Sequence, residues 1–178
     1  MTTATGYSIW LMPEGEIYSR LENLISKLSK KYKTPKFKPH LTLIGEIQDS
    51  KEDIMHKTSN LARAISPYDI ILSGVSYLDE YFRSLFIKAK QTDELLKSNL
   101  VARSMFNREN DQKYIPHLSL MYGNLTSKTK ETIIFEIGRE FNFTFRVKSI
   151  HLYSTNGQVN DWFKIKEFPV REGESIYV

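Results

Sequence analysis

A repeated motif of seven residues most constrains what this chain can fold into. Residues 37–43 read FKPHLTL and residues 114–120 read YIPHLSL. Each copy has an aromatic residue, a spacer, Pro, His, Leu, a hydroxyl residue and Leu, in that order. The two histidines, His40 and His117, are half of the four histidines in the chain. Two copies with the same order and spacing indicate two equivalent strands that present the same side chains.

The elements predicted around the two motifs also repeat. Hydrophobic periodicity predicts strands at 6–12, 40–47 and 68–78, separated by helices at 14–32 and 50–65. The series then begins again, with strands at 84–90, 117–122 and 143–154, helices at 92–105 and 127–140, and a last strand at 161–168. Because strand–helix–strand–helix–strand occurs twice, we expect two halves related by an approximate twofold axis, with both histidine strands bordering one cleft.

The length of 178 residues is that of one ordinary domain. We expect a single domain over residues 1–170, with one half at about 6–80 and the other at about 83–168. The polar residues 171–178 are predicted to be a C-terminal tail. The predicted fold class is α+β, with two lobes around a central cleft, each built from an antiparallel sheet and outer helices.

Composition excludes several kinds of site. The chain has no cysteine, so disulfides, thiolate zinc sites and a cysteine nucleophile are excluded, and the composition fits a reducing cytoplasm. The formal net charge of +4 favours an anionic substrate. No apolar run approaches the roughly 20 residues of a membrane span, and the N-terminus lacks the pattern of a signal peptide. We therefore expect a cytoplasmic protein with no membrane partner, and take a monomer as the default.

Alternation along a strand groups the polar side chains of each motif. His40 and Thr42 point to one face, roughly 6–7 Å apart, while the leucines point to the other face and anchor the strand. The same holds for His117 and Ser119. If the two strands face one cleft, two imidazoles and two hydroxyls converge there.

This constellation suits a phosphodiester reaction that needs no metal. A neutral histidine can take a proton from the attacking water while a protonated histidine donates one to the leaving oxygen. The hydroxyls of Thr42 and Ser119 can donate hydrogen bonds to the non-bridging phosphate oxygens. Metal binding by the two histidines is the alternative, but neither HExxH nor a carboxylate at matching offsets supplies a third ligand. No metal site and no cofactor are predicted.

The motifs HLTL (40–43) and HLSL (117–120) resemble those of the 2H phosphoesterases, a superfamily named for two H-x-[T/S]-x motifs. The opening YSIWLMPEG and the run HLSLMYG are similar to the small cyclic nucleotide phosphodiesterases of plants and yeast. This resemblance implies a bilobal fold and metal-independent hydrolysis of a ribose cyclic phosphate. It implies as substrates ADP-ribose 1″,2″-cyclic phosphate, a by-product of tRNA splicing, and nucleoside 2′,3′-cyclic phosphates.

The resemblance also implies roles for individual residues. His40 and His117 would be the acid–base pair, and Thr42 and Ser119 the phosphate-binding pair. Trp10 would stack on the substrate, with an ordinary core position as the alternative.

Three further aromatic residues are candidates for substrate binding. By the resemblance, Tyr122 would line the cleft. Tyr81 and Phe82 join the two halves and are predicted either to cap the cleft as a stacking lid or to form a plain hairpin tip.

Departures from the sequence pattern of the RNA-end members of the superfamily narrow the range of expected substrates. Those members tend to carry a Phe just after the first motif and an Arg just after the second, where this chain has IGE (44–46) and MYG (121–123). We therefore expect a small nucleotide cyclic phosphate as substrate, although no side chain for a second phosphate group can be identified. An RNA 2′,3′-cyclic phosphodiesterase or ligase acting on RNA ends and a non-catalytic nucleotide-binding module are the alternatives.

A lysine-rich segment precedes the first motif. KLSKKYKTPKFK (27–38) carries six lysines. It could steer an anionic substrate towards the cleft, or it could be a solvated helix end whose charges complement the helix dipole. The sequence leaves both interpretations open.

Overall fold

Strands and helices alternate along the computed structural model, which describes residues 2–171. The strands are β1 (Tyr7–Leu11), β2 (Leu41–Ile47), β3 (Tyr68–Ser76), β4 (Leu85–Ala89), β5 (His117–Met121), β6 (Glu140–Val147), β7 (Ser149–Ser154) and β8 (Phe163–Pro169). The helices are α1 (Gly15–Tyr32), α2 (Lys51–Ala64), α3 (Asp93–Met105) and α4 (Ser127–Ile137), with short 3₁₀ turns η1 (Tyr81–Arg83) and η2 (Val159–Asp161). Of the predicted C-terminal tail, residues 172–178 lie outside the described residues.

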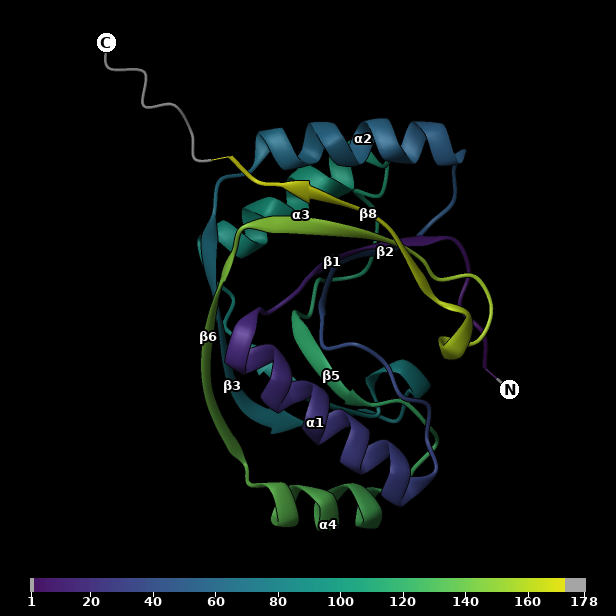
Figure 1. Cartoon of the computed structure of the whole chain (residues 1–178), viewed down its shortest axis with the longest axis vertical. Coiled ribbons are helices and arrows are strands. Elements are labelled where there is room, and N and C mark those ends of the chain that lie inside the picture. Colours follow the sequence, from purple (N-terminus) through teal and green to yellow (C-terminus); the bar gives the residue numbers. More distant parts are fainter. Residues whose placement is uncertain (1, 172–178) are drawn as a thin grey trace.

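The described strands form one antiparallel sheet in the order β6-β3-β4-β5-β2-β1-β7-β8. The junction at its centre is thin, because β2 and β5 share a single register pair, Leu41 opposite Leu118. On either side of this junction lie four strands, so the sheet has two halves that curl around the middle of the molecule (Figure 1). The predicted mixed α/β fold with antiparallel strands is confirmed, although the two predicted sheets are joined into one.

The two halves of the sheet are not the two halves of the chain. Strand β3, from the first half of the sequence, pairs with β4 and β6. Strand β7, from the end of the sequence, pairs with β1, and β8 adds to its outer edge. Each half of the sheet therefore contains strands from both halves of the chain, which ties the predicted halves together.

Helices cover the outside of the sheet in two pairs. Figure 1 shows α1 with α4 on one side of the molecule and α2 with α3 on the other. An ion pair of 2.7 Å between Lys31 and Glu136 links α1 to α4. Helix α1 follows β1 but packs against β5, and α3 follows β4 but packs against β2. Each motif strand is thus supported by a helix from the other half of the chain.

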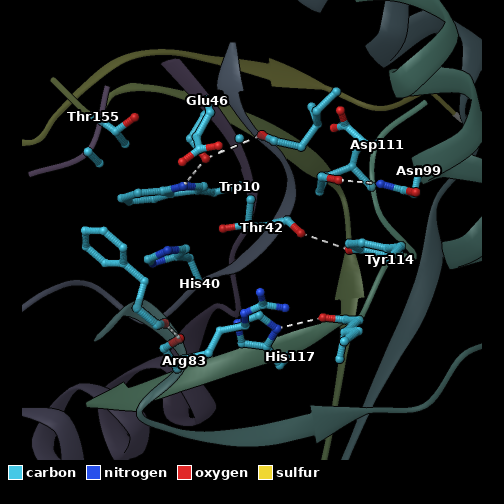
Figure 2. A pocket seen from close by; sticks show the side chains of 18 of the residues that line it. Trp10, His40, Thr42, Glu46, Arg83, Asn99, Asp111, Tyr114, His117 and Thr155 are labelled. Atoms are coloured by element: carbon cyan, nitrogen blue, oxygen red, sulfur yellow. Dashed lines mark hydrogen bonds between the residues drawn. The ribbon is translucent and has the colours of Figure 1, made fainter. Parts of the chain in front are cut away.

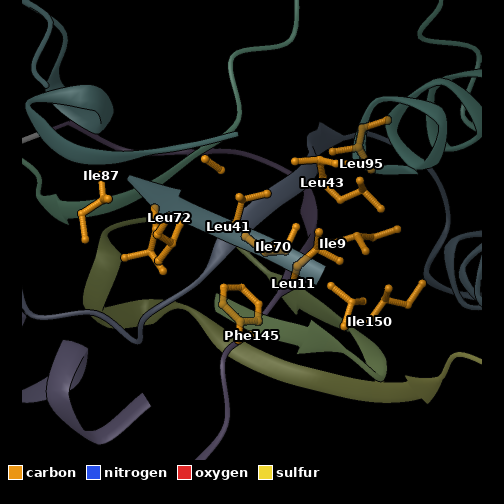
Figure 3. Packing of buried hydrophobic residues seen from close by; sticks show 14 of the residues in the cluster. Ile9, Leu11, Leu41, Leu43, Ile70, Leu72, Ile87, Leu95, Phe145 and Ile150 are labelled. Carbon is orange, nitrogen blue, oxygen red and sulfur yellow. The ribbon is translucent and has the colours of Figure 1, made fainter. Parts of the chain in front are cut away.

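The leucines of both motifs point towards these helices and into the core. Leu41, Leu43 and Leu118 are fully buried and Leu120 is 1 % exposed. Figure 3 shows Leu41 and Leu43 among the other buried apolar side chains of the sheet. This confirms the predicted alternation and sends the histidines and hydroxyls of the motifs to the opposite, concave face.

The prediction of one continuous strand at 143–154 was wrong. Two strands occupy this region, β6 paired with β3 and β7 paired with β1, and Lys148 separates them. Helix α4 also ends three residues earlier than predicted, at Ile137, where Gly138 takes a φ of 93° that suits glycine. The apolar positions change phase at Lys148, from odd numbers up to Val147 to even numbers from Ile150, so the pattern does mark a break that the prediction missed. It does not indicate that the two strands pair with different partners.

Candidate active site

A cavity of about 500 Å³ is lined by residues of both motifs. His40 and Thr42 contribute from the first motif, and His117 and Ser119 from the second. Figure 2 shows His40, Thr42 and His117 around the same space. Leu41 lies opposite Leu118 in the antiparallel pair of β2 and β5. His40 is therefore opposite Ser119, and Thr42 is opposite His117. The four predicted side chains are therefore brought together crosswise.

A backbone carbonyl two residues earlier holds each imidazole. Nδ1 of His40 lies 2.6 Å from the carbonyl oxygen of Lys38, and Nδ1 of His117 lies 2.7 Å from that of Ile115. Because a carbonyl only accepts, Nδ1 donates in both rings, which leaves Nε2 as the acceptor of the neutral imidazole. The proline between carbonyl and histidine explains the repeat, since a residue before proline is held in an extended conformation.

The two histidines differ in their surroundings. His40 is 4 % exposed, and burial lowers its pKa to about 4, with a smaller contribution from His117 and opposition from the Lys38 carbonyl. His117 is half-buried, and burial lowers its pKa as well. The positive charge of Arg83 lowers the pKa of His117 further, while Glu80 raises it. Burial therefore favours the neutral form of both imidazoles.

The two hydroxyl residues of the motifs differ in their burial and in their hydrogen bonds. Ser119 is buried, and its Oγ donates a hydrogen bond of 3.2 Å to the carbonyl of Phe82. Thr42 is half-buried, and its backbone carbonyl accepts a hydrogen bond of 2.9 Å from the hydroxyl of Tyr114. A phosphate oxygen that receives a hydrogen bond from Ser119 has to replace the Phe82 carbonyl as acceptor.

Trp10 is sandwiched between two other rings. The His40 imidazole stacks on one face at 3.6 Å and the Tyr153 ring on the other at 3.7 Å. Its Nε1 donates to the Ser8 hydroxyl at 2.8 Å, and the residue is 2 % exposed. Neither face of the indole is free for a substrate base, which favours the alternative of a core position. In that position Trp10 supports the ring of His40.

Two of the three remaining predicted aromatics line the cavity. Tyr122 and Phe82 line it, and Tyr122 is buried with its ring stacked on Phe37 at 3.9 Å. Tyr81 is not part of the described cavity wall; its ring packs edge-on against Phe82 at 5.0 Å. The amide of Gly123 donates to the Tyr81 carbonyl at 2.9 Å, so this turn is fastened to the end of the second motif.

Arg83 is a cavity residue that the sequence analysis did not identify. It lines the cavity from η1, close to His117 (Figure 2). Its Nε donates to the Glu80 carboxylate at 2.7 Å. The three-residue spacing of Glu80 and Arg83 indicates an ion pair, but nothing in the sequence indicates that this turn folds over the second histidine. Arg83 supplies a cation beside His117.

Two further arginines that line the cavity hold the loop before the second motif. Arg103 donates to the carbonyls of Asp111, at 3.1 Å, and of Gln112, at 2.6 Å. Arg108 donates to the Asp111 carboxylate at 2.8 Å and to the carbonyl of Glu46 at 2.9 Å. These hydrogen bonds fix both arginines in the wall of the cavity.

Within residues 2–171, no three His, Cys, Asp or Glu side chains gather in a way that could hold a metal ion. In the same range, no helix has the length and apolarity needed to cross a membrane. The polar groups around the cavity are chiefly imidazoles, hydroxyls, carboxylates and guanidinium groups.

Comparison with known proteins shows which protein family this chain resembles. A family model described as "Cyclic phosphodiesterase-like protein" matches residues 5–172. The cyclic phosphodiesterase of Arabidopsis thaliana is 26 % identical over 125 residues, which cover 70 % of this chain and 69 % of that protein. The 2′,3′-cyclic-nucleotide 3′-phosphodiesterase of Phaeosphaeria nodorum is 29 % identical over 137 residues, covering 68 % of this chain and 71 % of that protein.

Solved structures share the fold at lower identity. A Thermus thermophilus protein superposes with a TM-score of 0.66 and 17 % identity, covering 94 % of this chain and 99 % of that one. LigT of E. coli, complexed with 3′-AMP, superposes with a TM-score of 0.65 and 16 % identity over the same shares of both chains. The curled antiparallel sheet with outer helices is therefore an architecture that this chain has in common with LigT.

Proposed function

The chain belongs to the family of cyclic phosphodiesterase-like proteins, and we propose that His40 and His117 carry out its hydrolysis of ribose cyclic phosphates. It is a cyclic phosphodiesterase of the 2H phosphoesterase type. One observation carries the assignment to the two histidines. His40 directly precedes β2 and His117 begins β5; their imidazoles are fixed in the same tautomer by equivalent carbonyls and line one cavity.

His40 acts as the general base in this proposal. Its low pKa, caused by burial, keeps Nε2 unprotonated over most of the working pH range. Nε2 accepts a proton from a water molecule as the water oxygen forms a bond to phosphorus. A bound phosphate and the imidazolium attract each other, so the pKa of His40 rises as the proton arrives.

His117 acts as the general acid. It is less buried than His40 and lies near Glu80, whose charge favours the protonated ring. An anionic cyclic phosphate in the cavity favours that form further. His117 then donates its Nε2 proton to the ribose oxygen as the bond between that oxygen and phosphorus breaks. The products are a phosphomonoester and a free ribose hydroxyl, with one water molecule consumed.

The non-bridging oxygens are held by groups on both strands. The hydroxyls of Thr42 and Ser119 donate hydrogen bonds where negative charge develops, and Arg83 adds a positive charge. Removing one such donor from an enzyme typically costs roughly 10²–10³-fold in kcat when the donor is well aligned. Because Ser119 first has to leave the Phe82 carbonyl, we expect its removal to cost less than this.

The substrates proposed are nucleoside 2′,3′-cyclic phosphates and ADP-ribose 1″,2″-cyclic phosphate. The Phaeosphaeria nodorum relative is named for 2′,3′-cyclic nucleotides, and structures of LigT hold 3′-AMP, ATP and NADP⁺. A cavity of about 500 Å³ falls in the range typical of sites for small ligands. These observations support a substrate of nucleotide size.

Phosphorus NMR of the purified protein with each substrate, in the presence of EDTA, tests the proposal. Conversion of the cyclic signal into one monoester signal is expected, and the position of the monoester identifies the bond that breaks. Turnover that needs an added metal ion contradicts the two-histidine mechanism. Binding of the nucleotides without turnover supports a nucleotide-binding module, and turnover of cyclic-phosphate RNA ends alone supports the RNA-end enzyme.

A further inference from the structure

A second cavity, of about 560 Å³, lies next to the first. Both cavities are bordered by Trp10 and Trp162. His40 lines the first and Tyr153 the second, and these two rings stack on opposite faces of the Trp10 indole at 3.6 and 3.7 Å. The indole of Trp10, with Tyr153 on its far face, therefore lies between the proposed catalytic base and the second cavity, and Trp162 borders both cavities.

The walls of the second cavity are basic. Lys36, Lys38 and Lys164 line it, whereas Glu22 is its only acidic side chain among the described residues. Lys36 and Lys38 are exposed and take part in none of the ion pairs found in residues 2–171. Lys164 is engaged by Glu167 at 2.8 Å. The two free ammonium groups favour an anion such as a phosphate.

The second cavity also offers surfaces for a planar ring. Phe163 lines it and is 58 % exposed, which leaves much of this large apolar side chain in contact with solvent. Trp162 is half-buried, and its Nε1 is buried without a hydrogen-bond partner among the described residues. A basic groove with exposed aromatic rings is the usual means of binding the bases and phosphates of single-stranded nucleotide chains.

We propose that this second cavity is a subsite for a second nucleotide unit, a phosphate with its base, attached to the ribose that carries the cyclic phosphate. Lys36 and Lys38 bind the added phosphate, and Phe163 stacks with the added base. The subsite rests on the proposed function, since it needs the reacting ribose to be held at His40 and His117. It also assigns a role to part of the lysine-rich segment that precedes the first motif.

Two kinds of substrate carry a second nucleotide unit of this chemistry, and one kinetic experiment distinguishes them. Steady-state kinetics compare adenosine 2′,3′-cyclic phosphate with ADP-ribose 1″,2″-cyclic phosphate and with the dinucleotide ApA that ends in a 2′,3′-cyclic phosphate. The variants are Lys36→Glu and Phe163→Ala. Matched controls are Lys30→Glu, which makes the same charge change at an exposed site on α1, and Phe135→Ala, which removes an aromatic ring that is 88 % exposed on α4.

Each subsite variant is expected to lower kcat/KM about 5-fold or more for at least one two-unit substrate and to change it less than 2-fold for the mononucleotide. The substrate affected identifies the source, either a free dinucleotide-like molecule or an RNA end. Equal effects on all three substrates, or effects no larger than those of the control variants, overturn the subsite. If the wild-type protein hydrolyses none of the three, the proposed function itself fails.

Discussion

His40 and His117 lie in copies of one motif, yet their surroundings differ. Both rings donate Nδ1–H to the carbonyl two residues earlier, at 2.6 and 2.7 Å. His40 is almost fully buried and stacks on Trp10. His117 is half-buried, lies 4.9 Å from the Phe86 ring at a steep angle, and is near the charges of Arg83 and Glu80. The motif thus sets the tautomer of each ring, while the neighbours that the fold brings in set its basicity.

Removing either imidazole is the largest perturbation of this pair. We expect His40→Ala and His117→Ala each to lower kcat by at least about 100-fold, because each deletes one of two proton transfers. His56→Ala is the control, since His56 is exposed on α2 and lines neither cavity. Steady-state kinetics and circular dichroism check activity and folding. Near-wild-type turnover by either folded variant contradicts the assignment.

The burial of His40 predicts acid sensitivity of the fold. Its pKa in the folded state, about 4, lies below the ordinary value of 6.5, so the folded protein excludes a proton that the unfolded chain binds. This contribution to stability is fully present above pH 6.5 and is lost as the pH falls towards 4, at a cost of about 3 kcal/mol.

Urea unfolding at pH 7 and at pH 4 measures this loss. His40→Gln, which cannot take up that proton, should lose less stability between the two pH values than the wild type. His117→Gln should reduce the loss by a smaller amount, because the ring of His117 is less buried. An equal loss in the wild type and in His40→Gln shows that other groups cause the acid sensitivity.

The aromatic supports of the two rings should also contribute unequally. Trp10→Leu removes the platform under His40, and we expect kcat to fall about 10-fold with a smaller change in KM. Phe86→Leu removes a tilted neighbour of His117 and should cost less. Trp10→Phe, which keeps a ring, should recover part of the loss. If Trp10→Leu raises KM alone, the indole serves the substrate rather than the histidine.

The smallest expected effect of the difference between the two histidines is on the pH dependence of kcat/KM and kcat. Because the base must be unprotonated, kcat/KM should rise through a pKa near 4, and because the acid must be protonated it should fall through the pKa of His117, which lies below 6.5. The optimum of kcat/KM is therefore expected on the acid side of neutrality. In kcat the descending limb should move to higher pH, since bound phosphate favours protonated His117. A kcat/KM that still climbs between pH 7 and 9 rules out this pairing.

Much of the site could be predicted because its residues depend on local pattern. Two residues, His40 and Thr42, share a face through strand alternation, and the second motif repeats the arrangement. The structure brings all four side chains to one cavity, as predicted, while their catalytic and phosphate-binding roles stay predictions. Arg83 and Trp162 escaped prediction because their cavity positions depend on where η1 and the segment after η2 fold, which no local pattern reports.

Trp10 illustrates the limit of a motif-based assignment. The residue lies on the cavity side of β1, as a cleft residue should, and it does line the cavity. Whether its ring faces are free depends on Tyr153, which follows it by more than 140 positions and reaches it through the pairing of β1 with β7. A ring that covers a distant neighbour leaves no trace in the sequence around either residue.

The sequence by itself determined the alternation of strands and helices, the repeated Pro–His units and their carbonyl-held imidazoles, because these depend on residues one to four positions apart. Only the tertiary structure decided that β3 and β7 cross to the opposite halves of the sheet, and that the strands on either side of Lys148 have different partners. It also decided the different burial of the two histidines. Strand partners and burial depend on packing free energy summed over contacts between distant segments, so a local pattern carries little information about them.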